Sequence, residues 1–167
     1  MADINYNPEE KVVSLVELLF FAYRDFVADP DHILEGLGFG RAHHRVLHFV
    51  GRNPGLTVAS LLEILQITKQ SLARVLKELI DKGYVFQREG DEDRRQRLLH
   101  LSPSGEALRR KLMAPQLARF QRAVSESECT PAQFHAMLLH LVDPANQEMA
   151  EGMTQGETAA LASKDQR

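Results

Sequence analysis

The sequence predicts a mainly helical chain with one small β-hairpin, and three observations support this fold class. Apolar residues recur every three to four positions through most of the chain, as in amphipathic helices. Strand-forming residues gather in two short runs, residues 84–88 and 98–101, around a charged segment. Hydroxyl residues, proline and glycine stand where helices would begin or end.

The N-terminal part of the chain predicts a polar arm followed by a very apolar helix. Residues 1–8 are mostly polar, and the helix would run from Glu9 to about Ala28. Its apolar side chains lie nearly all round, so it must be covered on more than one side, most simply by a partner subunit. Asp29-Pro30-Asp31 is predicted to end it, because the residue before a proline resists helical dihedrals.

A glycine-rich loop over residues 36–40 leads to a predicted helix from Arg41 to about Gly51. This helix is rich in histidine and would pack between the dimerisation helices and the segment that follows. Asn53-Pro54-Gly55 is a turn by composition.

Two short helices are predicted next. Thr57 can cap the first, which carries leucines at helical spacing, and Gln66-Ile67 forms the turn. Thr68 can cap the second, which would run for about 14 residues. Gly83 is the expected stop, because glycine tolerates the left-handed conformation that closes helices.

The second helix divides into two faces. An apolar stripe consists of Leu72, Val75, Leu76 and Leu79, whereas Gln70, Arg74 and Lys77 lie opposite, with Lys69 and Ser71 near the N-terminal edge. An ordinary amphipathic surface helix has the same pattern. The hairpin that follows it favours a more specific interpretation, a winged helix-turn-helix. In such proteins the second helix enters the DNA major groove.

The charged tip of the hairpin, residues 89–95, carries both signs. We expect Asp93 to orient a neighbouring arginine through a bidentate pair. That arginine could reach a narrow minor groove, where the negative potential is strongest. A solvated charged loop is the alternative interpretation.

Two more helices are predicted after the hairpin. Ser102-Pro103 would start a long helix to about Val124, and Thr130-Pro131 a second one that reaches Val142. From Asp143 the tail is polar, and we expect a short helix at most.

The stretch Asp93-Arg94-Arg95-Gln96-Arg97-Leu98-Leu99-His100-Leu101-Ser102-Pro103-Ser104-Gly105 resembles the wing signature of the MarR family, Asp-x-Arg followed by Leu-Thr and a glycine. Asp93 and Arg95 match Asp-x-Arg, and Leu101-Ser102 stands where Leu-Thr is usual. The similarity extends in outline from about Lys11 to Val142. It implies a single MarR-like domain, in which residues 41–101 bind DNA, residues 9–35 and 102–142 form the dimer, and residues 143–167 are a tail.

The resemblance further implies a homodimeric transcription regulator that binds double-stranded DNA and responds to a small-molecule effector. The residues expected at the DNA are Thr68, Lys69, Gln70, Ser71, Arg74, Lys77, Asp93, Arg94, Arg95 and Arg97. In such proteins the effector pocket commonly lies at the helix junction. Candidates for its walls are Tyr23, Phe39, His43, His44 and His48.

Other functions remain as alternatives. His44 and His48 share a helix face and could both bind a metal ion. A zinc site needs further ligands, and no HExxH motif or cysteine pair supplies them. A metal-responsive regulator is therefore a secondary hypothesis, and no cofactor is expected. A winged helix that binds a protein is another, because fold does not fix function. No phosphate loop or nucleophile elbow indicates an enzyme. The single Cys129 excludes an internal disulfide framework.

Composition agrees with a DNA-binding segment inside an acidic chain. The 167 residues suffice for one domain with a core and carry a net charge of -3. Residues 41–110 hold 13 basic and 8 acidic residues, a net +5, whereas the remainder holds 7 and 15, a net -8. No stretch is long enough to span a bilayer and no signal segment is visible, so a cytoplasmic protein is expected.

Overall fold

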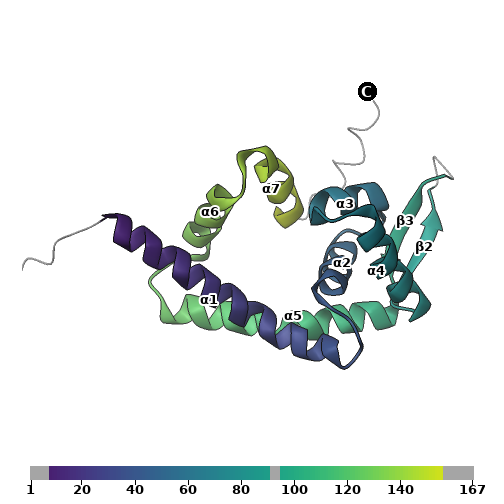
Figure 1. Cartoon of the computed structure of the whole chain (residues 1–167), viewed down its shortest axis with the longest axis horizontal. Coiled ribbons are helices and arrows are strands. Elements are labelled where there is room, and N and C mark those ends of the chain that lie inside the picture. Colours follow the sequence, from purple (N-terminus) through teal and green to yellow (C-terminus); the bar gives the residue numbers. More distant parts are fainter. Residues whose placement is uncertain (1–7, 91–94, 156–167) are drawn as a thin grey trace, which may run out of the picture.

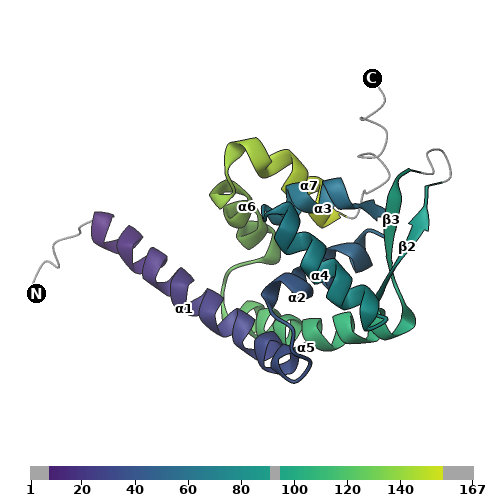
Figure 2. The same cartoon turned by 45° about the vertical axis from the view of Figure 1, so that its right-hand side comes forward.

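The computed structural model describes residues 8–90 and 95–155. Helix α1 and helix α5 lie side by side, the winged helix is attached at one end of this pair, and α6 and α7 follow α5 (Figures 1 and 2). The helices are α1 (Pro8–Glu35), α2 (Arg41–Arg52), α3 (Val58–Leu65), α4 (Lys69–Asp81), α5 (Pro103–Glu126), α6 (Pro131–Leu141), the 3-10 helix η1 (Pro144–Asn146) and α7 (Gln147–Gln155). The strands are β1 (Leu56–Thr57), β2 (Val85–Glu89) and β3 (Arg97–Leu101).

Helix α1 continues through Pro30, so the prediction that it ends at Asp29-Pro30-Asp31 is wrong. A proline inside a helix lacks the N–H that would bond to the carbonyl four residues earlier, here that of Phe26. In this protein Gln116 of α5 donates its Nε2–H to the Phe26 carbonyl at 3.3 Å. Gln116 is only 4% exposed, so the bond lies in the buried contact between the two helices. A side chain from a distant segment thus satisfies the carbonyl that Pro30 leaves free.

The predicted helix starts and stops within the winged helix are confirmed. Thr57 Oγ1 accepts from the Ser60 N–H at 3.1 Å, and Thr68 Oγ1 accepts from the Ser71 N–H at the same distance. Gly83 follows α4 with a φ of 75°, a conformation that favours glycine. Each short helix therefore has the cap that its own sequence provides.

Among the described residues the sheet has three strands, one more than predicted. Strands β2 and β3 form the expected antiparallel hairpin, with Glu89 opposite Arg97 and Val85 opposite Leu101. The additional strand β1 pairs with β3 on its other side, where Leu56 stands opposite Leu99. This pairing ties the start of α3 to the base of the wing.

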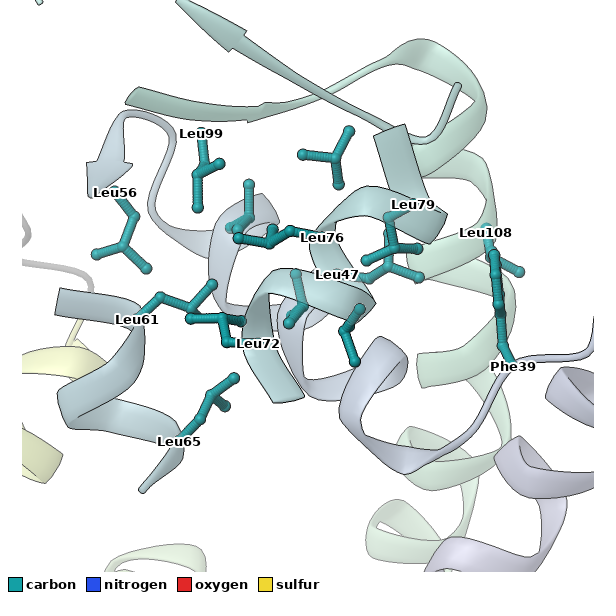
Figure 3. Close-up of a cluster of buried hydrophobic side chains, with 14 of the residues drawn as sticks. Phe39, Leu47, Leu56, Leu61, Leu65, Leu72, Leu76, Leu79, Leu99 and Leu108 are labelled. Atoms are coloured by element: carbon teal, nitrogen blue, oxygen red, sulfur yellow. The ribbon is translucent and has the colours of Figure 1, made fainter. Parts of the chain in front are cut away.

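The hydrophobic core lies where α2, α3 and α4 pack between the sheet and α5 (Figure 3). Leu47, Leu61, Leu72, Leu79 and Leu99 are fully buried. They come from three helices and a strand, so the core fixes α4 relative to the wing.

Many apolar side chains outside this core are exposed. On the N-terminal two thirds of α1, Leu18 is 60% and Phe20 is 68% exposed. Leu117 of α5 and Leu141 of α6 are similarly open, at 53% and 61%. No helix within residues 8–90 or 95–155 combines the length and hydropathy that crossing a membrane would require.

Candidate nucleic-acid interface

Helix α4 buries one face and presents the other to solvent. Leu72, Val75, Leu76 and Leu79 are in the core, as the sequence predicts. The opposite face carries the predicted DNA-contacting residues, all exposed: Thr68, Lys69, Gln70, Ser71, Arg74 and Lys77. Because the core holds the buried face, these polar side chains occupy a fixed position relative to the wing.

The turn before α4 sets the direction in which that helix starts. Gln66 takes a left-handed φ of 52°, and its side chain donates to the Glu63 carbonyl at 2.7 Å. Thr68 Oγ1 both accepts from the Ser71 N–H and donates to Ser71 Oγ at 2.9 Å. These bonds hold the two hydroxyls at the exposed N-terminal end of α4, where a helix also favours anionic groups such as phosphate.

The two cations in the middle of α4 each have a carboxylate one turn away. Arg74 Nη1 lies 3.9 Å from Glu78 Oε1, and Lys77 pairs with Asp81. The Arg74 and Lys77 side chains remain 72% and 74% exposed. Exposed pairs of this kind contribute little to stability, so exchanging the carboxylate for a phosphate costs little.

The Glu78 carboxylate also forms a hydrogen bond with His43 of α2. His43 Nδ1 accepts from the Gly40 N–H at 3.1 Å, so the ring hydrogen is on Nε2, which donates to Glu78 Oε2 at 2.7 Å. His43 is buried and stacks on Phe39 with ring centroids 4.4 Å apart. Sequence spacing does not indicate this link between the loop before α2 and the exposed face of α4, because His43 and Glu78 are 35 residues apart.

The wing projects beyond α4 at the edge of the molecule (Figure 1). Arg97 Nη1 pairs with Glu89 Oε1 across the hairpin at 3.0 Å, and Arg95 is exposed. Asp93 and Arg94, which carry part of the predicted signature, lie outside the described residues. Arg88 is a further exposed cation on β2, outside the predicted set, and strand alternation is the signal that places it at the surface.

The predicted effector-pocket residues lie in different surroundings within the single chain. Tyr23 is 55% exposed on α1, whereas Phe39 and His43 pack together in the core. His44 is partly buried, and desolvation lowers its pKa. His48 lines a cavity of about 500 Å³, whose other walls include η1 and α7. The role of the five residues in effector binding therefore stays a prediction.

The described residues offer no metal centre. Within residues 8–90 and 95–155, no group of three or more His, Cys, Asp or Glu side chains is arranged to hold a metal ion. Cys129 is exposed in the loop between α5 and α6, where its thiol lies 3.6 Å from the Thr130 carbonyl.

These features together define a winged helix-turn-helix protein with an exposed polar face on its second helix and a charged wing. Known proteins with similar sequences show which family within this class the chain resembles. The model of the MarR family matches residues 37–96. The chain is 46% identical over 138 residues to the HTH-type transcriptional regulator PetP of Rhodobacter capsulatus, an alignment that covers 82% of this chain and 83% of that protein.

Solved structures agree on the fold. Streptococcus pneumoniae FabT in complex with DNA superposes with a TM-score of 0.65 at 18% identity, covering 84% of this chain and 98% of that chain. A MarR-family regulator from Silicibacter pomeroyi superposes with a TM-score of 0.60 at 24% identity, covering 74% and 82%. The chain belongs to the MarR family of transcriptional regulators.

Proposed function

We propose that the protein is a homodimeric repressor that binds a pseudo-palindromic operator and is modulated by a small molecule. The observation that carries the proposal is the division of α4 into a fully packed apolar face and an exposed polar face beside the wing. In a dimer, two such helices would enter successive major grooves about 34 Å apart. FabT, which has the same fold, was solved in complex with DNA.

Each predicted DNA residue has a role in this proposal. Gln70 and Arg74 would read base edges, because their side chains can each make two hydrogen bonds, to adenine and guanine respectively. Ser71 would read bases beside them, Lys69 and Lys77 would hold phosphates, and Thr68 would lie at the same surface. On the wing, Arg94, Arg95 and Arg97 would reach the backbone and minor groove, with Asp93 orienting one of them.

The exposed apolar faces support dimerisation. The isolated chain leaves Leu15, Leu18, Leu19 and Phe20 of α1 at 49–68% exposure. A groove of about 410 Å³ between α5 and α6 is lined chiefly by apolar residues, including Phe120, Phe134 and Leu138. Contiguous apolar surface of this extent marks an interaction site. A second copy of α1 supplies matching apolar surface for this groove.

The proposal is tested in two steps. Genomic fragments selected by the purified protein at roughly physiological salt would define the operator. Operator affinity is then measured for the wild type and for Arg95→Ala. We expect Arg95→Ala to weaken binding by about tenfold or more, because an arginine in a narrow minor groove gains from a strong negative potential. The control is Lys111→Ala, which removes an exposed cation from the first half of α5, outside α4, the wing and the later part of α5.

Several outcomes would contradict the proposal. Unchanged operator affinity in Arg95→Ala would defeat the wing assignment. Fragments bound without a shared motif, together with an affinity that barely changes with salt, would favour a winged helix that binds a protein partner. Phosphate contacts release counterions, so a true operator complex must weaken steeply as salt rises.

A further inference from the structure

Helix α4 carries two carboxylates, Glu78 and Asp81, on a helix otherwise suited to a negatively charged partner. Each carboxylate lies four residues after a cation expected at the DNA, Arg74 for the first and Lys77 for the second. Phosphates repel both carboxylates, so each of them disfavours DNA binding unless it acts through the cation beside it. The two positions are alike in sequence spacing and differ in how the carboxylate is held.

The Glu78 carboxylate is anchored to a buried group, whereas the Asp81 carboxylate lies in solvent. Helix α2 packs against α4 (Figure 2), and its residue His43 donates Nε2–H to Glu78 Oε2 at 2.7 Å. The His43 side chain is only 7% exposed. The Asp81 side chain is 56% exposed and its partner Lys77 is 74% exposed, so both members of that pair are open to water.

The His43 ring that anchors Glu78 is itself held on two sides. Its Nδ1 accepts from the Gly40 N–H at 3.1 Å, and the ring stacks on Phe39 with an angle of 14° between the planes. The Lys82 ammonium, at the end of α4, lies 4.4 Å from the centroid of the same Phe39 ring. Rotation of the histidine ring would break these contacts. His43 therefore presents its Nε2–H donor at a fixed place beside α4.

The second oxygen of Glu78 faces Arg74. Glu78 Oε1 lies 3.9 Å from Arg74 Nη1, an ion-pair distance, and the Arg74 side chain is 72% exposed. A guanidinium has five N–H donors in one plane, so one edge can face a carboxylate while another meets a guanine. A long, exposed arginine loses rotamer entropy when DNA immobilises it. A carboxylate that is already fixed reduces the number of orientations before DNA binds.

We propose that Glu78, held by His43, is a positioning residue that orients Arg74 to read guanine at one position of the operator. This role rests on the proposed function, because Arg74 must meet a base. The ion pair itself adds little to stability, so the effect belongs to base discrimination rather than to folding. The alternative is direct reading, in which the Glu78 carboxylate would itself accept from the amino group of a cytosine.

The test measures base discrimination, which a merely structural residue would not change at one position alone. Dissociation constants are measured by fluorescence anisotropy for the selected operator and for operators with each base pair of the half-site replaced in turn. The position read by Arg74 is the one at which Arg74→Ala loses its preference. We expect Glu78→Gln to reduce discrimination at that position by about threefold or more, because a misaligned arginine loses part of a bidentate contact.

Glu78→Gln preserves the local structure while removing the charge, since the glutamine oxygen can still accept from His43. Asp81→Asn is the matched control, because it removes a carboxylate from the same helix. It should change affinity for all operators alike, through weaker repulsion of phosphate, and leave the discrimination as it is. His43→Phe keeps a ring against Phe39 but has no donor, and it should lose discrimination at the same position as Glu78→Gln. If His43→Phe does not fold, Glu78→Gln and Asp81→Asn decide the question.

A double-mutant cycle separates positioning from direct reading. If Glu78 acts through Arg74, adding Glu78→Gln to Arg74→Ala should change no base preference further. An effect of Glu78→Gln that persists without Arg74 would establish direct reading and overturn the positioning role.

Other results would also contradict the positioning role. These are unchanged discrimination in Glu78→Gln, an equal change in Asp81→Asn, and an Arg74→Ala protein that keeps every base preference. Wild-type protein that selects no operator would overturn the proposed function and this role with it. Wild-type protein that binds its operator, with Glu78→Gln indistinguishable from it, would overturn the positioning role alone.

Discussion

The two halves of the molecule differ in where their apolar side chains lie. In the winged-helix half, residues 36–101, leucines such as Leu61 and Leu99 are fully buried by other parts of the same chain. In the helical half, which comprises α1, the later part of α5 and α6, Phe20 and Leu141 remain more than 60% exposed. The core of the first half is complete within the single chain, with Leu34, Leu108, Leu112 and Met153 added from α1, α5 and α7, whereas the apolar face of the second half is left exposed. One chain therefore positions α4 and the wing by itself, and we propose that a second copy covers the exposed apolar face of the other half.

A charge on the exposed apolar face of α1 should produce the largest effect. Phe20→Glu places a carboxylate in the centre of the proposed dimer interface, although Phe20 is 68% exposed in the single chain. We expect monomers by analytical ultracentrifugation. Operator affinity should fall about a hundredfold or more, because two linked half-site contacts become one.

The matched control places the same charge on the winged-helix half. Ile80 of α4 is also an exposed apolar residue, at 36%, but it stands alone rather than in a patch. Ile80→Glu should leave the oligomeric state unchanged. If Phe20→Glu still sedimented as the wild type does, the comparison between the two halves would be wrong.

The junction between the halves depends on a glycine, and its replacement should have the next largest effect. A Cβ on Gly105 would lie 2.0 Å from the Tyr84 carbonyl oxygen. That oxygen also accepts from the Ser102 N–H at 3.0 Å, so neither backbone can move without breaking the contact. We expect Gly105→Ala to lower the free energy of unfolding by about 3 kcal/mol, measured by urea denaturation.

Gly36→Ala is the control for that measurement. Its added Cβ would meet only the Ile33 carbonyl oxygen, at 3.8 Å, which is ordinary van der Waals contact. Equal stability of the two variants would show that the approach of α5 to the start of the wing is not as tight as the structure has it. The contact also gives a physical reason for the glycine in the wing signature.

The sequence predicted those features that are encoded locally. Thr57 and Thr68 cap helices through atoms three residues away, so their position could be read from spacing alone. The exposed face of α4 followed from the spacing of its apolar stripe. The identity of the winged helix followed from the order of such local signals.

The remaining features depend on contacts between distant segments. The continuation of α1 through Pro30 needs Gln116, 90 residues later. Strand β1 has two residues and exists only by pairing with β3. The link from His43 to Glu78 and the cavity under α7 arise from tertiary packing. Met149 and Met153 in the polar tail pack onto the core, but the tail has no helical repeat of apolar residues that would have predicted this.

The contribution of the hydrogen bond between Gln116 and the Phe26 carbonyl to stability can be measured by mutation. Gln116→Leu keeps a similar volume but leaves the Phe26 carbonyl unsatisfied, which should cost about 1–2 kcal/mol in the free energy of unfolding. Pro30→Ala restores the backbone N–H that this carbonyl lacks. It should therefore stabilise the Gln116→Leu protein more than it stabilises the wild type. A double-mutant cycle by urea denaturation measures the difference, and two independent effects would contradict the explanation of Pro30.

The smallest effect should be the pH dependence that His48 of the winged-helix half gives to the free energy of unfolding. Its pKa in the folded protein is lowered to about 4, below the ordinary value of 6.5 that the unfolded chain keeps. Above pH 6.5 both states are neutral and stability is unaffected. As the pH falls from 6.5 towards 4, the unfolded chain takes up the proton first and stability is lost.

At pH 5 this loss should be about 1 kcal/mol, after allowance for the partial exposure of the ring. Desolvation also lowers the pKa of His44 and His100, so the wild type is compared with His48→Phe at each pH rather than with itself. The variant should gain about 1 kcal/mol relative to the wild type between pH 7.5 and pH 5. A constant difference would mean that His48 is as well solvated in the folded protein as in the unfolded chain. The buried core of the winged-helix half would then be less complete than the single chain shows.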